Sequence, residues 1–292
     1  MTTRTLNQLP VPGATLHYEV TGSGPMLLLI PDGDSDAGAF DDITAHLSTA
    51  YTVVAYDPRG NSRSPYIPAV PDNPTPAATP ASLTDDPVAT STADALALID
   101  LLSPTAPAFV FGTGTGAITG LDLITHHPSR VRLLVAHEPP CIELLPTPTD
   151  ARAFFEDVHA TNLREGPETA QLLYAGGTGL SEDPLPNPED LRPEYKELQS
   201  RTSKNTETYF AHKLLPFITY TPNLPALLPH ATKIIPAAGQ QAPNHLPALP
   251  IFTLATHLGW PVVTFPGAHP GYLSHPTPFA TLLTQVLEAE LT

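Results

Sequence analysis

Short apolar runs separated by longer helical patterns limit most strongly what this chain can fold into. The run Met26-Leu27-Leu28-Leu29-Ile30 contains no polar residue, as expected for a strand that is covered on both faces. Further mainly apolar runs of similar length lie at residues 51–56, 108–111, 131–136, 232–237 and 261–265. Covered strands that alternate with helices predict an α/β fold, with a mostly parallel central sheet flanked by helices.

Local patterns also predict several boundaries. Residues 14–20 alternate apolar and polar side chains, which predicts an edge strand of a hairpin turned by residues 21–24. A helix is expected to begin at Ser91, with Thr90 or Ser91 itself as its cap. Other helices are expected at about 38–47, 117–125, 246–258 and 278–291.

The middle of the chain has a different pattern and predicts an inserted unit. Residues 141–230 contain helical stretches and no convincing strand, so we expect a helical cap there. The α/β core would then comprise residues 1–140 and 231–292. Residues 65–92 are rich in Pro, Ala, Thr and Asp without a helical or strand period, which predicts an exposed loop.

Charge and cysteine content exclude several classes of function. With 29 acidic and 13 basic residues, the formal charge of −16 repels phosphate backbones and anionic membranes. We therefore expect a small-molecule substrate and neither a nucleic-acid nor a membrane partner, while a homodimer stays open. The single cysteine, Cys141, excludes an intrachain disulfide and a thiolate metal cluster.

Neither targeting nor cofactor signals are evident. The first 13 residues lack the apolar core of a secretion signal, so a cytoplasmic protein is expected. The histidines show no H-x-H or H-E-x-x-H spacing, and we expect no metal or cofactor.

A glycine-rich turn follows the apolar run at residues 108–111. The chain reads Gly112-Thr113-Gly114-Thr115-Gly116 and continues as a helical pattern. Small outer residues let a strand and a helix approach across a sharp turn, and a central glycine accepts a positive φ without strain. Such a turn could also cradle an anion at the helix N-terminus. The G-x-G-x-x-G spacing of dinucleotide-binding turns is not met, because Ala117 follows Gly116.

Four stretches, in order, resemble landmarks of the α/β-hydrolase superfamily along nearly the whole chain. Pro31-Asp32-Gly33 resembles the oxyanion loop, and residues 57–64 resemble a D-x-R-G-x-S-x-S stretch. Residues 112–116 resemble the G-x-S-x-G nucleophile elbow, and residues 266–272 resemble the loop of the catalytic histidine. The oxyanion loop more usually reads His-Gly. Pro31-Asp32-Gly33 and His137-Glu138-Pro139-Pro140 are also similar to stretches of the zearalenone lactonases.

This resemblance implies a role for each candidate site residue. His269 corresponds to the catalytic histidine, and Gly114 takes the place of the nucleophilic serine. The backbone N–H groups of Gly33 and Thr115 would form the oxyanion hole. Glu138 is the candidate triad acid because it follows the strand after the elbow's helix, whereas residues 238–242 after the cap contain no carboxylate. A threonine nucleophile is not expected, because neither elbow threonine stands at the tip of the turn.

Three functions remain open without the serine. The chain resembles enzymes that act on a small apolar ester, lactone or polyketide-like molecule, and any activity would rest on Glu138, His269 and the oxyanion loop. The same pair could move a proton in an isomerase, lyase or cyclase of small-molecule biosynthesis. A catalytically inactive protein that binds a ligand under the cap is the third alternative. Cap aromatics would shape the pocket, although ordinary helix packing explains most of them.

Overall fold

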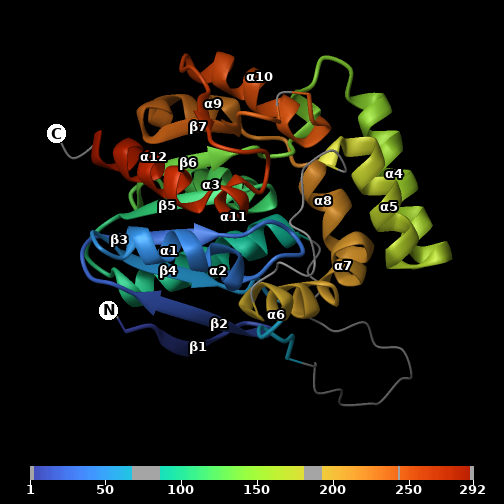
Figure 1. Cartoon of the computed structure of the whole chain (residues 1–292). Coiled ribbons are helices and arrows are strands. Elements are labelled where there is room, and N and C mark those ends of the chain that lie inside the picture. Colours follow the sequence, from blue (N-terminus) through green and yellow to red (C-terminus); the bar gives the residue numbers. More distant parts are fainter. Residues whose placement is uncertain (1–2, 68–85, 181–192, 243, 290–292) are drawn as a thin grey trace.

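The computed structural model describes residues 3–67, 86–180, 193–242 and 244–289. Its eight-stranded sheet is shown in Figure 1 and has the order β1 (Thr5–Val11), β2 (Ala14–Thr21), β4 (Thr52–Tyr56), β3 (Met26–Ile30), β5 (Ala108–Thr113), β6 (Val131–His137), β7 (Ile234–Gly239) and β8 (Val263–Phe265). The pairs β1–β2 and β2–β4 are antiparallel, and every pair from β4 to β8 is parallel. The predicted mostly parallel α/β sheet is confirmed.

Helices cover both faces of the sheet, which explains why the central strand β3 is wholly apolar. Leu27 and Leu29 of β3 pack in the core beneath α1 (Asp41–Leu47), α11 (Gly271–Ser274) and α12 (Pro276–Ala289). Leu28 and Ile30 point to the opposite face and pack in the core under α2 (Pro87–Leu102), α3 (Thr115–His126), α9 (Leu224–Leu227) and α10 (Leu249–Leu258). Because successive side chains of a strand alternate between faces, a strand covered on both sides needs apolar residues throughout.

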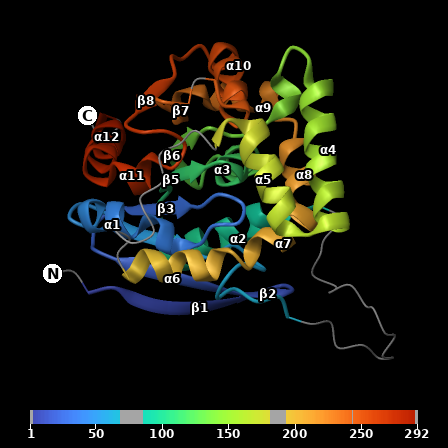
Figure 2. The same cartoon turned by 45° about the vertical axis from the view of Figure 1, so that its right-hand side comes forward.

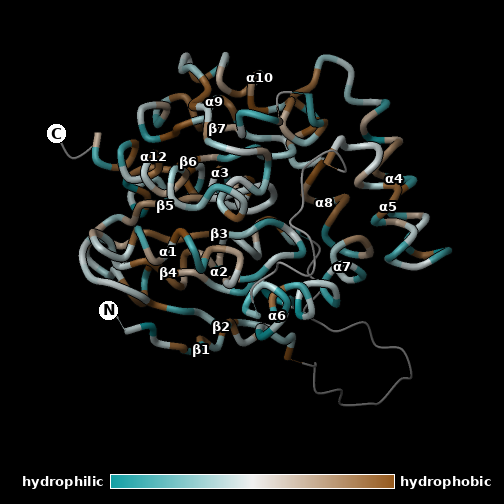
Figure 3. Tube along the Cα trace, viewed as in Figure 1, coloured by the Kyte–Doolittle hydropathy of each residue, from teal (hydrophilic) through white to brown (hydrophobic). Residues whose placement is uncertain are grey.

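The segment between β6 and β7 is helical in its described part. It contains α4 (Pro148–Glu165), α5 (Pro167–Thr178), α6 (Pro193–Thr202), α7 (Asn205–Thr208), a π-helical turn (Tyr209–Lys213) and α8 (Leu214–Ile218). Figure 2 shows α4 and α5 side by side, and an apolar cluster joins α4, α5, the π-helical turn and α8. In Figure 3, α8 is hydrophobic along its length, whereas α6 is mainly hydrophilic. The cap boundaries at residues 141 and 230 stay predictions.

Short 3₁₀ turns complete the described elements, at Ala37–Phe40, Ile142–Leu144, Leu228–Lys233 and Leu246–Ala248. None of the helices in the described ranges is long and apolar enough to cross a membrane.

The prediction of an edge strand at residues 14–20 was wrong. Strand β2 lies inside the sheet, between β1 and β4. Its hairpin partner is β1, and the turn is made by Pro12 and Gly13, whose φ of 79° suits glycine. Thr21 ends β2, and residues 22–25 connect β2 to β3.

The predicted start of the second helix was also wrong. Helix α2 begins at Pro87, where the missing N–H of proline costs nothing, and the Asp86 side chain accepts a hydrogen bond from the backbone N–H of Ala89. The predicted loop over residues 65–92 therefore ends before Pro87. At its start, Tyr66 forms a β-bridge with Ala14. Residues 68–85 of that loop lie outside the described residues.

We predict that Phe111→Ala costs about 3–5 kcal/mol in free energy of unfolding, because it empties a fully buried site. The Phe111 ring centroid lies 5.9, 6.5 and 5.7 Å from those of Phe40, Tyr272 and Phe279. Urea unfolding followed by circular dichroism measures the loss. Leu172→Ala on α5 is the control, since Leu172 is 76% exposed and its truncation should cost under about 0.5 kcal/mol. Equal costs for the two variants would contradict the described core.

Candidate active site

The glycine-rich turn between β5 and α3 is a tight strand-to-helix junction. Gly114 has φ 55° and ψ −124°, and its N–H donates to the carbonyl of His137 over 3.0 Å. A Cβ on Gly112 would collide with the backbone of Gly116, and a Cβ on Gly116 would collide with the carbonyls that end β3. The outer glycines are therefore required by the close approach of the backbone, as the elbow pattern predicts.

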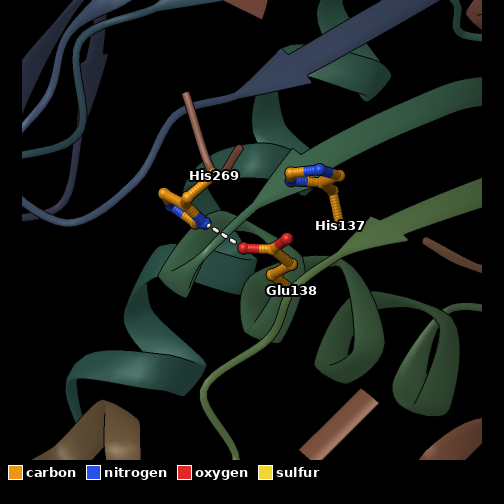
Figure 4. A group of neighbouring side chains, drawn as sticks. All are labelled: His137, Glu138 and His269. Carbon is orange, nitrogen blue, oxygen red and sulfur yellow. Dashed lines mark hydrogen bonds and ion pairs between the residues drawn. The ribbon is translucent and has the colours of Figure 1, made fainter. Parts of the chain in front are cut away.

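The structure brings Glu138 and His269 together, although 131 residues separate them. Glu138 directly follows β6, and His269 lies in the loop after β8. The His269 Nδ1 lies 2.6 Å from Glu138 Oε2, as Figure 4 shows, and the N–H of Gly239 donates to Glu138 Oε1 over 2.7 Å. Glu138 adopts a φ of 49°, which is strained for a residue other than glycine and is typical of positions held for function.

The two backbone N–H groups assigned to the oxyanion hole converge on one atom. Gly33 and Thr115 donate their N–H groups to Asp32 Oδ1 over 2.7 and 2.8 Å. The hydroxyl of Thr115 adds a third hydrogen bond to the same oxygen, over 3.2 Å. A negatively charged oxygen therefore has a complete set of donors at this point, which is the environment that an oxyanion needs.

Asp32 is the site residue that sequence reasoning missed. Its carboxylate lies where a side chain on Gly114 would stand, because a Cβ built on Gly114 would collide with it. Asp32 Oδ2 is 3.2 Å from His269 Nε2, so Asp32, His269 and Glu138 form a continuous hydrogen-bonded chain. The available signal was an acidic residue in the oxyanion loop combined with a glycine at the elbow.

Two carboxylates on one imidazole shift the protonation of all three groups. Burial disfavours the charged form of His269, but its hydrogen bonds to Asp32 and Glu138 outweigh burial and raise its pKa to about 10. Burial alone would raise the pKa of Asp32 and Glu138. The hydrogen bonds that Asp32 accepts hold its pKa below the ordinary range, and at Glu138 the neighbouring His137 and the hydrogen bonds from His269 and Gly239 have the same effect. At neutral pH, Asp32 and Glu138 are therefore carboxylates, and His269 between them is an imidazolium.

His137 lies beside the hydrogen-bonded group of Asp32, His269 and Glu138 but makes no hydrogen bond to it in the described structure. Its Nδ1 is 3.1 Å from Thr113 Oγ1, and its ring packs against Phe265 and Phe279. Burial lowers its pKa to about 4, so it is neutral at pH 7. Ligand atoms of His137, Glu138 and His269 all lie within 4.8 Å of one another. The Glu138–His269 hydrogen bond accounts for much of this closeness, and we assign no metal there.

Side chains from the loop after β4 and from the π-helical turn hold the loop after β3 in place. Asn61 donates through Nδ2 to the carbonyl of Gly33 over 2.9 Å. Lys213, at the end of the π-helical turn, donates through Nζ to Asn61 Oδ1 over 2.6 Å. The ring of Tyr209, from the same turn, packs directly on Gly33. The position of the Gly33 N–H thus depends on the helical segment between β6 and β7 as well as on β3.

Known proteins resemble the chain over its whole length. It is 32% identical over 289 residues to the uncharacterized hydrolase YraK of Bacillus subtilis (strain 168), which covers 97% of this chain and 96% of the relative. The chain belongs to the α/β-hydrolase superfamily. It is also 25% identical to the zearalenone hydrolase of Bionectria ochroleuca, over 99% of this chain and 100% of the relative. None of the protein-family models compared with the chain matches it.

Solved structures support the same fold. A thermophilic esterase from Thermogutta terrifontis, in a malate-bound form, superposes with a TM-score of 0.70 over 100% of both chains at 18% identity. At that identity the likeness concerns the fold alone, and it supports the α/β-hydrolase fold of this chain.

We predict that Asp32→Asn lowers the pKa of His269 by about 1 to 3 pH units, because it removes one of two adjacent negative charges. In the unchanged chain, the pKa of about 10 keeps the His269 imidazole protonated between pH 6 and 8. The variant should titrate closer to neutrality in histidine NMR spectra, with the resonance assigned by its loss in His269→Gln. Asp157→Asn, at an exposed carboxylate on α4, is the control and should leave the titration unchanged. An unaltered pKa in Asp32→Asn would show that Asp32 does not contact His269 in solution.

Proposed function

We propose that this chain is a hydrolase that adds water directly to a small, largely apolar ester or lactone. His269, held by Glu138, acts as the general base, and Gly33 and Thr115 stabilise the oxyanion. Because Gly114 carries no nucleophile, the reaction proceeds without an acyl-enzyme on the elbow. The observation that carries this proposal is the Glu138–His269 hydrogen bond of 2.6 Å beside two N–H groups that converge on one oxygen.

Asp32 controls whether the N–H groups of Gly33 and Thr115 are free to bind a substrate and whether His269 is neutral. Its Oδ1 lies where the carbonyl oxygen of a substrate would accept the two N–H groups, so an ester must displace the carboxylate. Displacement also separates Asp32 from His269 and removes one of the charges that keep the imidazole protonated. Substrate binding and formation of the neutral base are thereby coupled in a single movement of one side chain.

Apolar surroundings support an apolar substrate. A small cavity adjoins Gly33 and Thr115, and its other walls are formed mainly by apolar and aromatic side chains, among them Ile30, Tyr56, Tyr209 and Phe217. These walls would contact an apolar group of a substrate, with the N–H groups of Gly33 and Thr115 as the polar contacts. The name of the relative from Bionectria ochroleuca, zearalenone hydrolase, supports a lactone among the candidate substrates.

We predict that His269→Gln lowers kcat/KM for p-nitrophenyl butyrate by about 10²–10⁴-fold, the usual contribution of a general base. Glu138→Gln should lower it less, because the imidazole remains but loses its orienting carboxylate. In both cases hydrolysis is followed by nitrophenolate release, with Asp157→Asn as the control. Unchanged turnover in His269→Gln would contradict the proposal. If the unchanged chain binds the ester but never hydrolyses it, the chain is a ligand-binding protein instead.

We predict that Asp32→Ala raises kcat/KM for the same ester by about tenfold, because the substrate no longer competes with a charge-assisted hydrogen bond of ~1.5 kcal/mol. The pH dependence should change too. The unchanged chain gains activity as pH rises toward the His269 pKa of about 10, where the neutral base forms, and the variant should reach its plateau at lower pH. A fall in activity to the level of His269→Gln would show that Asp32 assists ester hydrolysis rather than opposing it.

We predict that Gly114→Ser creates a serine esterase only when Asp32 is also removed. A serine Cβ would collide with the Asp32 carboxylate, so the single variant must first move that side chain. For p-nitrophenyl butyrate, kcat/KM of the double variant with Asp32→Ala should exceed that of Asp32→Ala alone on the order of 10²-fold or more. This gain is a small part of the roughly 10⁶-fold that a complete triad contributes to turnover. A burst of nitrophenolate in stopped-flow mixing reports the acyl-enzyme. If a correctly folded double variant shows neither gain nor burst, the elbow assignment is wrong.

A further inference from the structure

Lys213 is a buried cation that forms no ion pair with any of the described carboxylates. Its side chain lies at the end of the π-helical turn, and the residue is only 8% exposed. Nζ donates to the carbonyl of Arg59 over 2.7 Å and to Asn61 Oδ1 over 2.6 Å. An ammonium has three N–H groups, and the described residues offer no acceptor to the third. Because a buried charge is costly unless it is compensated, this N–H is available to a ligand.

The two carboxylates that act on Lys213 are bound to other side chains. Arg59 donates through Nε and Nη2 to Asp94 over 2.7 and 2.5 Å, and the hydroxyl of Thr206 donates to Asp34 Oδ2 over 2.9 Å. Asp94 and Asp34 raise the pKa of Lys213, but burial and the charge of Arg59 outweigh them and lower it to about 7. A ligand that accepts a hydrogen bond from Nζ would therefore stabilise the charged form of Lys213.

Lys213 lines the cavity that adjoins Gly33 and Thr115. The i→i+5 hydrogen bonds of the π-helical turn keep Tyr209 and Lys213, four residues apart, on nearly one face, and both line this cavity. Among the described lining residues, Lys213 alone carries a charge. The cavity volume of about 20 Å³ is enough for one water or one oxygen-bearing group of a ligand.

We propose that Lys213 is a specificity-determining residue, whose third N–H binds a keto oxygen on the acyl part of the substrate while the ester group occupies the oxyanion hole. This inference rests on the proposed ester hydrolysis and narrows the substrate class to keto esters and keto lactones. A keto group brings one neutral oxygen into the small cavity. A carboxylate would bring two oxygens and a further negative charge near Asp34 and Asp94. The apolar walls would contact the hydrocarbon part of the acyl group.

The same ammonium also positions the loop after β3. Lys213 Nζ donates to Asn61 Oδ1, and Asn61 Nδ2 donates to the carbonyl of Gly33 over 2.9 Å. Removal of Lys213 would therefore lower activity toward every ester, because the Gly33 N–H loses part of its support. A loss that is specific for keto substrates is the effect that a merely structural role would not produce.

The test compares two esters that differ by one keto oxygen, p-nitrophenyl 4-oxopentanoate and p-nitrophenyl pentanoate. Each kcat/KM is divided by the rate constant of the same ester with hydroxide, which corrects for intrinsic reactivity. The unchanged chain should prefer the keto ester by about tenfold or more, as expected for a hydrogen bond to a charged group. Lys213→Met should lower this ratio to about one. Asn61→Ala should lower the corrected kcat/KM of both esters and keep the ratio, because the ammonium remains. Lys204→Met, at an exposed lysine, is the control and should change neither value.

Binding measurements separate this subsite from the hydrolytic proposal. The matching anilides, N-(4-nitrophenyl)-4-oxopentanamide and N-(4-nitrophenyl)pentanamide, resist hydrolysis. Calorimetry should give the unchanged chain a Kd that is about tenfold lower for the keto anilide, and Lys213→Met should bind both anilides equally. If this preference appears but neither ester is hydrolysed, ester hydrolysis is wrong and the subsite is retained.

Three results would overturn the subsite. They are the absence of a keto preference in the unchanged chain, a preference that persists in folded Lys213→Met, and a higher corrected kcat/KM for p-nitrophenyl hydrogen glutarate than for the keto ester. The last result would show that Nζ binds an anion instead of a neutral oxygen. Circular dichroism checks that each variant is folded.

Discussion

The contact between Asp32 and the two backbone N–H groups of Gly33 and Thr115 is the interaction on which the whole site depends. It places a full negative charge beside His269 without an elbow side chain. A partly buried carboxylate is costly unless hydrogen-bonded, and here three donors and an imidazolium compensate it. The same contact occupies the predicted oxyanion hole, so a reaction there must either displace the carboxylate or use it.

The sheet and most of the site follow from patterns that are visible in the sequence. Met26 to Ile30 is apolar throughout because helices cover both faces of β3, and this predicted a central strand. Glu138 and His269 were found because each follows the end of a strand, where the carboxyl ends of parallel strands meet at one edge of the sheet. Whether each residue has the role implied by the family stays a prediction.

Other features could not be obtained from patterns, for physical reasons. Asp32 was visible as part of a loop, but the direction of its side chain depends on space left by Gly114 and on donors from two separate segments. Alternation in residues 14–20 shows a half-covered strand but not which neighbours it pairs with, so β2 was misplaced at the edge. The start of α2 was missed because Asp86 and Pro87, which cap it, share the composition of the preceding loop.

The hydrogen bonds from Lys213 to Asn61, and from Asn61 to the Gly33 carbonyl, connect the helical segment between β6 and β7 to the oxyanion loop. Local unfolding of that segment would release the Gly33 peptide before any strand of the sheet is lost. Loss of the site on heating would then precede global melting. The resistance of the site to heat would be set by the less extensive apolar cluster around Phe155 and Phe210, rather than by the sheet.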